Sequence, residues 1–421
     1  MMLQIRMIGL GLWAVWVVSA SCSLAAEVPE RGSPSVILIS LDGTRPQDVN
    51  PETMPFLVRR SASGAAAEGL QSVFPSNTFP AHVSLVTGVT PERHGLVNNG
   101  FRDPDPEFGR FWKGVPDIPR WIQVEPIWSL LESAGLPTAS FYWVGSEGAW
   151  PESGYGPGAW KKFDPKTSEA TKVDQILEWM SRPKSERPRL ITAWFQGGDH
   201  AGHQDGPGAE SVRRSLRRQD REIERLIEGL REQGRWDETT LLIVSDHGMA
   251  SAQRTVDVKA LLETPREGEG RKIAAEVYGI GGFASVVLRD PYAPSSEEPP
   301  ASQVAQRLRR AGLEAYPRSE APRSWGVAHP RFGDVVVRAP IGTAIVRQGL
   351  NIKGFHGYLP SHPEMDGIFY AFGRGVEPGR RLSGVQNVDV APTILELLSQ
   401  PIPSGMEGRA LNLGVDPAAG D

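Results

Sequence analysis

The sequence has almost no cysteine: Cys22 is the single one among 421 residues. It lies in an N-terminal stretch typical of an export signal, in which Arg6 precedes an apolar run at 7–18 and small residues follow in "SASCSLAAE". We therefore predict a signal peptide at 1–26, and its cleavage would remove Cys22. Disulfide bonds are excluded from the mature chain on this interpretation.

A long hydrophobic run is also missing. Residues 7–18 are shorter than the roughly 20 residues that cross a bilayer as a helix, so we expect no transmembrane anchor in the mature chain. The expected location is outside the cytoplasm, either periplasmic or secreted. The alternative is a lipoprotein attached through Cys22, but the preceding "VVSAS" lacks the apolar residue that such sites usually carry three positions upstream.

Charge of one sign is not in excess either. The chain has 45 lysines and arginines against 50 acidic residues, and its net charge is −5, so we expect no nucleic-acid polymer as a partner. The basic run "RRSLRR" at 213–218 lies in a segment with helical apolar spacing, which indicates a solvated helix face. Apolar residues make up 39% of the chain, enough for the core of one large domain, which we place at 27–415.

Three short apolar runs predict buried strands of a parallel sheet: "SVILIS" at 35–40, "RLITAWF" at 189–195 and "TTLLIVS" at 239–245. Helices are predicted at 209–233 and at 389–399, the second with an Asp389 cap. This alternation favours a layered α/β fold with a largely parallel central sheet flanked by helices.

The stretch 264–345 differs in composition, because it is rich in proline, glutamate and arginine. It also carries elements of its own: a strand near 284–288, a helix near 301–311, and short strands near 313–316 and 334–338. We therefore expect an inserted smaller α+β subdomain there.

An acidic residue follows each predicted strand: Asp42, Asp199 and Asp246. Functional groups of open α/β sheets gather at this edge. Three histidines also lie in glycine-containing segments: His203 in "GGDHAGH", His247 in "SDHGM" and His356 in "GFHGY". Mixed oxygen and nitrogen ligands suit zinc, and two such sets suit a two-metal centre. Each residue alone has a structural alternative, so the prediction depends on their joint occurrence; the other five histidines (His82, His94, His200, His329 and His362) are left out of the ligand set.

Thr78 lies between two prolines in "VFPSNTFPAH" at 73–82, ahead of an apolar segment that predicts a short helix. It is either an ordinary helix cap or a nucleophile, and one residue can be both. A hydroxyl group needs a base or a metal ion to become a nucleophile near neutral pH.

Seven motifs, in the same order along the chain, resemble those of the nucleotide pyrophosphatase/phosphodiesterase family of the alkaline phosphatase superfamily. They are "LISLDGTRP", "VFPSNTFPAHVSLVTGVTPERHGLVNN", "EPIW", "WVGSEG", "DHAGHQDGP", "VSDHGM" and "GFHGYLPSHPEMDGIFYAFG". Together they extend over nearly all of residues 35–410, and seven in register are highly specific. The chain departs from the family pattern in "WFQGGD", where many relatives have acidic residues and a proline, and at Val144, where proline is common.

The resemblance implies an alkaline phosphatase-like fold and a two-zinc enzyme that hydrolyses phosphodiester or phosphoanhydride bonds of nucleotides or similar small molecules. It assigns one zinc to Asp42, Thr78, Asp246 and His247, and the other to Asp199, His203 and His356. Thr78 would be the catalytic nucleophile and carry a phospho-threonine intermediate. Asn99, the second asparagine of "VNN", would be catalytic and substrate-binding through a hydrogen bond to a phosphoryl oxygen.

The resemblance also places four aromatic residues around the substrate: Phe79, Trp143, Phe163 and Trp194. A nucleotide base would stack on them, whereas the choline of a lipid head group would use cation–π contacts, and Glu147 suits either substrate. A phosphomonoesterase stays open, because the metal ligands are shared across the superfamily. A sulfatase is disfavoured because residues 78–82, "TFPAH", lack its C-x-P-x-R setting. If the protein bound zinc without catalysing a reaction, we would expect a metal ligand or the nucleophile to be missing from the sequence. None of them is missing.

Overall fold

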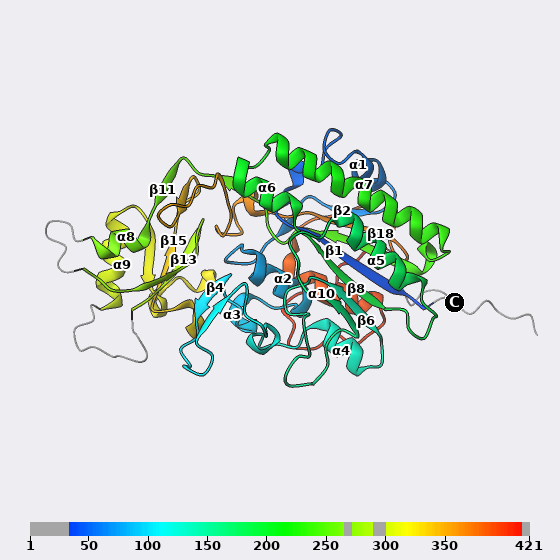
Figure 1. The fold of residues 1–421 in the computed structure, drawn as a ribbon, viewed down its shortest axis with the longest axis horizontal. Coiled ribbons are helices and arrows are strands. Elements are labelled where there is room, and N and C mark those ends of the chain that lie inside the picture. The colour runs from blue at the N-terminus through cyan, green and yellow to red at the C-terminus, as the bar shows by residue number, and fades with distance from the viewer. Residues whose placement is uncertain (1–32, 265–271, 289–299, 415–421) are drawn as a thin grey trace, which may run out of the picture. The chain divides into compact units, whose positions relative to one another are not determined.

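The computed structural model describes residues 33–264, 272–288 and 300–414 of the protein (Figure 1). The signal peptide predicted at 1–26, with Cys22, lies outside these residues. Among the helices of the described part of the chain, none combines the length and apolar character needed to span a membrane.

An eight-stranded sheet forms the centre of the fold. Its order is β19 (Arg380–Leu382), β2 (Ala65–Ala67), β18 (Phe369–Gly373), β9 (Thr239–Val244), β1 (Ser35–Leu41), β8 (Leu190–Phe195), β6 (Thr138–Phe141) and β7 (Ala159–Lys161). The strands from β9 to β7 are parallel, and β18 is antiparallel to both of its neighbours. The predicted strands at 35–40, 189–195 and 239–245 are β1, β8 and β9, adjacent at the middle of the sheet.

Helices cover both faces of this sheet (Figure 1). One face carries α1 (Pro55–Ser61), α5 (Glu169–Ser181) and α7 (Glu210–Glu232), and the other carries α2 (Thr78–Thr87), α4 (Ile127–Ser133) and α10 (Val390–Leu397). Alternate residues of β1 enter the two cores, with Ile37 and Ile39 on the side of α5 and α7, and Val36 and Leu38 on the side of α4 and α10. A strand buried on both faces must be apolar throughout, which is why the predicted runs were continuous.

Two predicted helices agree closely with α7 and α10. The basic run at 213–218 lies in α7, and its arginines are exposed or half-buried while Leu216 is in the core. Asp389 does occupy the N-cap position of α10, but its carboxylate accepts hydrogen bonds from the backbone of Gln386 and Arg409 instead of capping the helix.

A second, antiparallel sheet is formed within the predicted insertion. Its order is β12 (Glu276–Tyr278), β13 (Phe283–Val287), β15 (Val335–Arg338) and β14 (Glu314–Pro317), and α9 (Ala301–Arg310) packs on it with α8 (Val258–Glu263). Its core also includes Val256 and Phe355, which lie outside 264–345. The described residues from Ser33 onward form one compact unit, so the boundaries at 264 and 345 stay a prediction.

Candidate active site

Thr78 is the first residue of α2, a helix whose ten residues are all buried. The N-cap position belongs to Asn77, so the interpretation of Thr78 as an ordinary cap is wrong. Its Oγ1 instead lies 3.3 Å from Nε2 of His247. The start of a helix is a favourable place for negative charge, since the helix dipole is positive there.

The first group of candidate ligands lies at the carboxyl ends of two paired strands. Asp42 directly follows β1, and Asp246 and His247 follow the neighbouring β9. Nε2 of His247 lies 3.6 Å from Oδ1 of Asp42 and 3.2 Å from Oδ2 of Asp246. All three side chains are buried.

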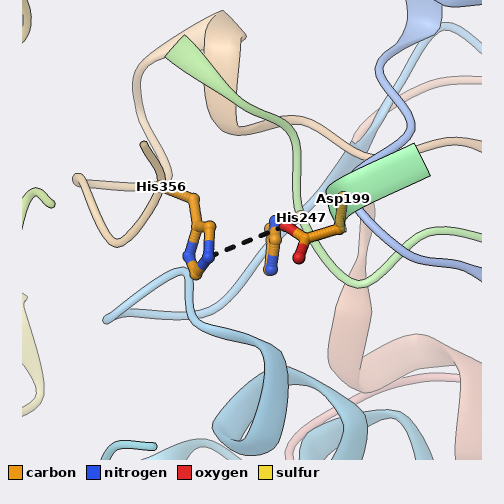
Figure 2. Close-up of side chains that lie close together, drawn as sticks. All are labelled: Asp199, His247 and His356. Atoms are coloured by element: carbon orange, nitrogen blue, oxygen red, sulfur yellow. Dashed lines mark ion pairs between the residues drawn. The ribbon is translucent and has the colours of Figure 1, made fainter. Parts of the chain in front are cut away.

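The second group is brought together from two separate segments. Asp199 and His203 lie one turn apart on α6 (Gly197–Asp205), and His356 follows β17 (Gly354–Phe355). Oδ1 of Asp199 lies 3.4 Å from Nε2 of His203 and 3.8 Å from Nε2 of His356. Figure 2 shows Asp199 and His356 approaching on either side of His247, whose ring stacks on that of His356 at 3.9 Å between centroids.

The imidazoles share one orientation. Nδ1 of His203, of His247 and of His356 lies 2.8–3.0 Å from a backbone carbonyl oxygen, those of Gly354, Gly248 and Ser76 respectively. A carbonyl oxygen only accepts, so Nδ1 is the protonated nitrogen and Nε2 carries a lone pair. Nε2 of His203 and Nε2 of His356 nevertheless face each other at 3.2 Å. Two lone pairs at this distance repel, and a cation bound by both removes the repulsion.

The carboxylates fit a cation as well. Oδ1 of Asp42, Oδ1 of Asp199 and Oδ2 of Asp246 are buried without a hydrogen-bond partner in the described part of the chain. Burial, with Asp246 and Asp199 nearby, raises the pKa of Asp42 well above its usual range. Buried carboxylate oxygens without partners cost free energy unless a proton or a metal ion balances them. The donor set therefore fits one or more divalent cations.

A pocket of about 530 Å³ opens beside these residues. Asp42, Thr78 and Asp199 form one side of it. Aromatic side chains form the walls: Phe79, Tyr142, Phe163 and Trp194. Phe163 stacks on Trp194 with 5.4 Å between centroids and 23° between planes, and Phe163 is 41% exposed at the mouth. Flat apolar walls of this kind suit a planar or cationic group.

Trp143, which we predicted to be one of these walls, does not line the pocket. It is fully buried, and its Nε1 donates a hydrogen bond to the carbonyl oxygen of His82. Its neighbour Tyr142 lines the pocket instead. β6 ends at Phe141, and Tyr142 has φ of 69°, in the left-handed region that few side chains adopt. At this turn Tyr142 lies in the same core as Phe141 before it, whereas Trp143 lies in the core on the other face of the sheet.

Asn99 lies next to Thr78, although 20 residues separate Asn99 from Phe79 in the sequence. Its Oδ1 accepts a hydrogen bond of 2.9 Å from the backbone N–H of Phe79. This contact makes Nδ2 the donor end of the amide, and Nδ2 has no hydrogen-bond partner among the described residues. That donor is therefore available to a ligand in the site.

Two charged groups of the pocket are strongly perturbed. Burial raises the pKa of Glu147 to about 7, and its Oε2 has no hydrogen-bond partner in the described part of the chain. Burial lowers the pKa of Lys172 to about 8, partly offset by Glu169 and Asp42. Perturbed groups in a pocket are typical of functional sites.

The sequence did not point to several pocket residues: Lys113, Ile118, Tyr142 and Lys172. Lys172 lies on α5, and the sequence of this helix predicts that its charged residues face solvent. No neighbouring residue in the sequence indicates that Lys172 is buried. His82, one of the five histidines left out of the ligand set, lies behind the site, with Nδ1 3.3 Å from Oδ2 of Asp246. His200 lines the pocket.

Comparisons with known proteins agree with this picture. A family model described as Type I phosphodiesterase/nucleotide pyrophosphatase matches residues 36–359. The chain is 26% identical to human ectonucleotide pyrophosphatase/phosphodiesterase family member 1, over 90% of this chain and 42% of that protein. It is 29% identical to an uncharacterized pyrophosphatase/phosphodiesterase of Schizosaccharomyces pombe, over 89% of this chain and 79% of that one.

A solved structure of murine ectonucleotide pyrophosphatase/phosphodiesterase 5, an inactive variant in complex with AMP, has the same fold. The TM-score is 0.77 at 22% identity, over 88% of this chain and 96% of that chain. The chain spans less than half the length of two of the curated relatives it matches, a nematode protein and the human one. The family model, however, extends over most of the chain and includes all seven candidate ligands. The chain therefore belongs to the Type I phosphodiesterase/nucleotide pyrophosphatase family.

Proposed function

We propose that the protein is an exported two-zinc phosphodiesterase/nucleotide pyrophosphatase that works through a phospho-threonine intermediate on Thr78. One observation carries the proposal most: buried carboxylate oxygens without partners, from Asp42, Asp199 and Asp246, lie with the imidazoles of His247 and His356 in two groups that could hold a metal ion. Both groups include His247, whose Nε2 lies 3.3 Å from the hydroxyl of Thr78. Carboxylate and imidazole ligands suit zinc. Export rests on the N-terminal sequence and on the word "ectonucleotide" in the names of relatives.

Asp42, Thr78, Asp246 and His247 would hold one zinc, and Asp199, His203 and His356 the other. When bound, the two ions would lower the pKa of the Thr78 hydroxyl and stabilise the negative charge of the attacking and leaving oxygens. Thr78 Oγ1 would bond to phosphorus as the ester or anhydride P–O bond breaks and its oxygen leaves with the alcohol or phosphate product. Nδ2 of Asn99 would donate to a phosphoryl oxygen. Water would then cleave the Thr78–phosphate ester.

The pocket supports a nucleotide as the substrate. AMP is bound by the murine relative of the same fold, and a base would stack in this chain against Phe163, Trp194 and Tyr142. The second candidate is a choline-phosphate diester, which the unpartnered carboxyl of Glu147 beside these rings also favours.

The first test is a paired assay of the zinc-loaded mature protein. We expect kcat/KM for the p-nitrophenyl ester of thymidine 5′-monophosphate to exceed by far that for p-nitrophenyl phosphate, the plain monoester. A preference for the monoester would overturn the diester proposal but would leave the proposed metal site standing. Comparison with p-nitrophenyl phosphocholine separates the base from choline.

A further inference from the structure

Trp194 makes a contact that a pocket wall does not need. Its indole Nε1 donates a hydrogen bond of 2.9 Å to Oδ2 of Asp42. The other oxygen of that carboxylate, Oδ1, has no hydrogen-bond partner among the described residues and faces Nε2 of His247 at 3.6 Å. The two oxygens of Asp42 are therefore divided, one held by the indole and one turned toward the candidate metal position.

The same indole forms part of the substrate pocket. Its ring stacks on Phe163 and meets Phe79 edge-on at 6.5 Å between centroids. Trp194 is only 8% exposed, so its orientation is fixed by packing on several sides. A shift of this ring would move the N–H donor and the aromatic wall together.

Lys172, which also lines the pocket, holds the backbone of Trp194. Its Nζ donates a hydrogen bond of 2.7 Å to the carbonyl oxygen of Trp194, and the side chain is 1% exposed. The ammonium group also lies 5.4 Å from the ring centroids of Tyr142 and of Phe195. A charge buried this deeply is costly unless it is well paired, and its main hydrogen bond is to Trp194.

We propose that Trp194 is a positioning residue for the metal ligand Asp42, held in place by Lys172, in addition to being a wall of the pocket. The inference rests on the proposed metal centre. Groups that hydrogen-bond a metal ligand fix its orientation, and their loss typically lowers metal affinity 10- to 100-fold. Metal affinity and substrate contact are thus linked in this protein through one indole ring.

The test measures zinc affinity by competition with a chromophoric chelator, starting from metal-free protein. Trp194→Phe keeps an aromatic ring and removes the N–H donor, so we expect the Kd of the zinc that Asp42 would hold to rise about 10- to 100-fold. Replacing Trp194 by β-(3-benzothienyl)alanine, which has sulfur in place of the N–H and nearly the same shape, should give the same rise. This second variant keeps the test valid if phenylalanine leaves too large a void.

Phe163→Leu is the matched control. It removes the ring that stacks on Trp194 and leaves the indole N–H, so KM for the nucleotide diester should rise while zinc affinity stays at the wild-type value. Lys172→Met should weaken zinc binding in the same direction as Trp194→Phe, and Lys172→Arg should restore it. Thermal unfolding of the metal-free variants separates a general loss of stability from a specific loss of zinc.

Wild-type zinc affinity in both Trp194 variants would overturn the inference, whatever their activity. Wild-type affinity in Lys172→Met alone would remove Lys172 from it. Failure of the wild-type protein to bind zinc would overturn the proposed metal centre itself, and the inference with it.

Discussion

Oδ1 of Asn99 accepts a hydrogen bond from the backbone N–H of Phe79, the residue that follows Thr78. The amide of Asn99 is therefore held against the backbone that follows Thr78 before any ligand binds. Such preorganisation is what makes a hydrogen-bond donor effective toward charge that develops during a reaction.

Asn99→Ala should lower kcat by roughly two to four orders of magnitude, because the donor to the phosphoryl oxygen is lost. Steady-state kinetics with the nucleotide diester measure this, and zinc content should remain that of the wild type. A rate close to that of the wild type would exclude Asn99 from the reaction.

Thr78→Ala should abolish turnover while zinc stays bound, since the other candidate ligands remain. Metal analysis of the purified variant and a turnover assay with the same sample check both halves. Thr78→Ser is the control, because it keeps a hydroxyl and should keep measurable turnover. Wild-type turnover in Thr78→Ala would refute the phospho-threonine mechanism.

Phe163→Ala should raise KM for nucleotide diesters by about 10- to 100-fold, the value of one stacking contact. Turnover of p-nitrophenyl phosphate should change little, because that substrate has no base to stack. The buried Trp143 offers the contrast: its substitution should lower the free energy of unfolding, since it packs in the core and not in the pocket.

Glu147 should make stability depend on pH. Burial raises its pKa in the folded protein from 4.5 to about 7, so between these values the unfolded chain has already released the proton that the folded protein keeps. The free energy of unfolding should therefore fall as pH rises from about 4.5 to 7 and then level off, with a total of about 3 kcal/mol at most. Denaturant unfolding at several pH values measures this slope.

Glu147→Gln should remove that slope and be more stable than the wild type above pH 7. If the choline candidate is right, binding of a cationic substrate should strengthen above pH 7 in the wild type and not in Glu147→Gln. An unchanged slope in the variant would show that another group causes the pH dependence.

A buried ion pair joins the second sheet's subdomain to the segment that follows Asn99. Nε of Arg331 lies 2.5 Å from Oδ2 of Asp103, and their side chains are 3% and 7% exposed. Arg331→Met would leave the Asp103 carboxylate buried without its partner, and we expect a loss of about 3–5 kcal/mol in denaturant unfolding. The double variant with Asp103→Leu should recover much of that loss. If it does not, the packing of Arg331 and not the ion pair is the source of the stability.

Much of the site followed from the sequence because strand ends are easy to locate. Asp42 and Asp246 follow adjacent parallel strands, so their meeting was a consequence of the sheet. The position of Trp143 could not be foreseen, since the left-handed backbone at Tyr142 depends on tertiary packing. Lys172 was equally hidden: its hydrogen bond crosses 22 residues to the strand β8, and a lysine on an amphipathic helix gives no sign of burial.

The seven candidate ligands are spread along the chain from residue 42 to residue 356. Nδ1 of His356 is held by the carbonyl oxygen of Ser76, 280 positions earlier. During synthesis or passage across a membrane, a chain that has emerged only as far as residue 355 would have Asp199 and His203 on one helix but no third ligand to close their group. Capture of the second ion is therefore expected to be among the last events of maturation. A truncation just before His356 would remove the third ligand of that ion together with β18, β19 and α10, so the central sheet would lack two of its strands as well.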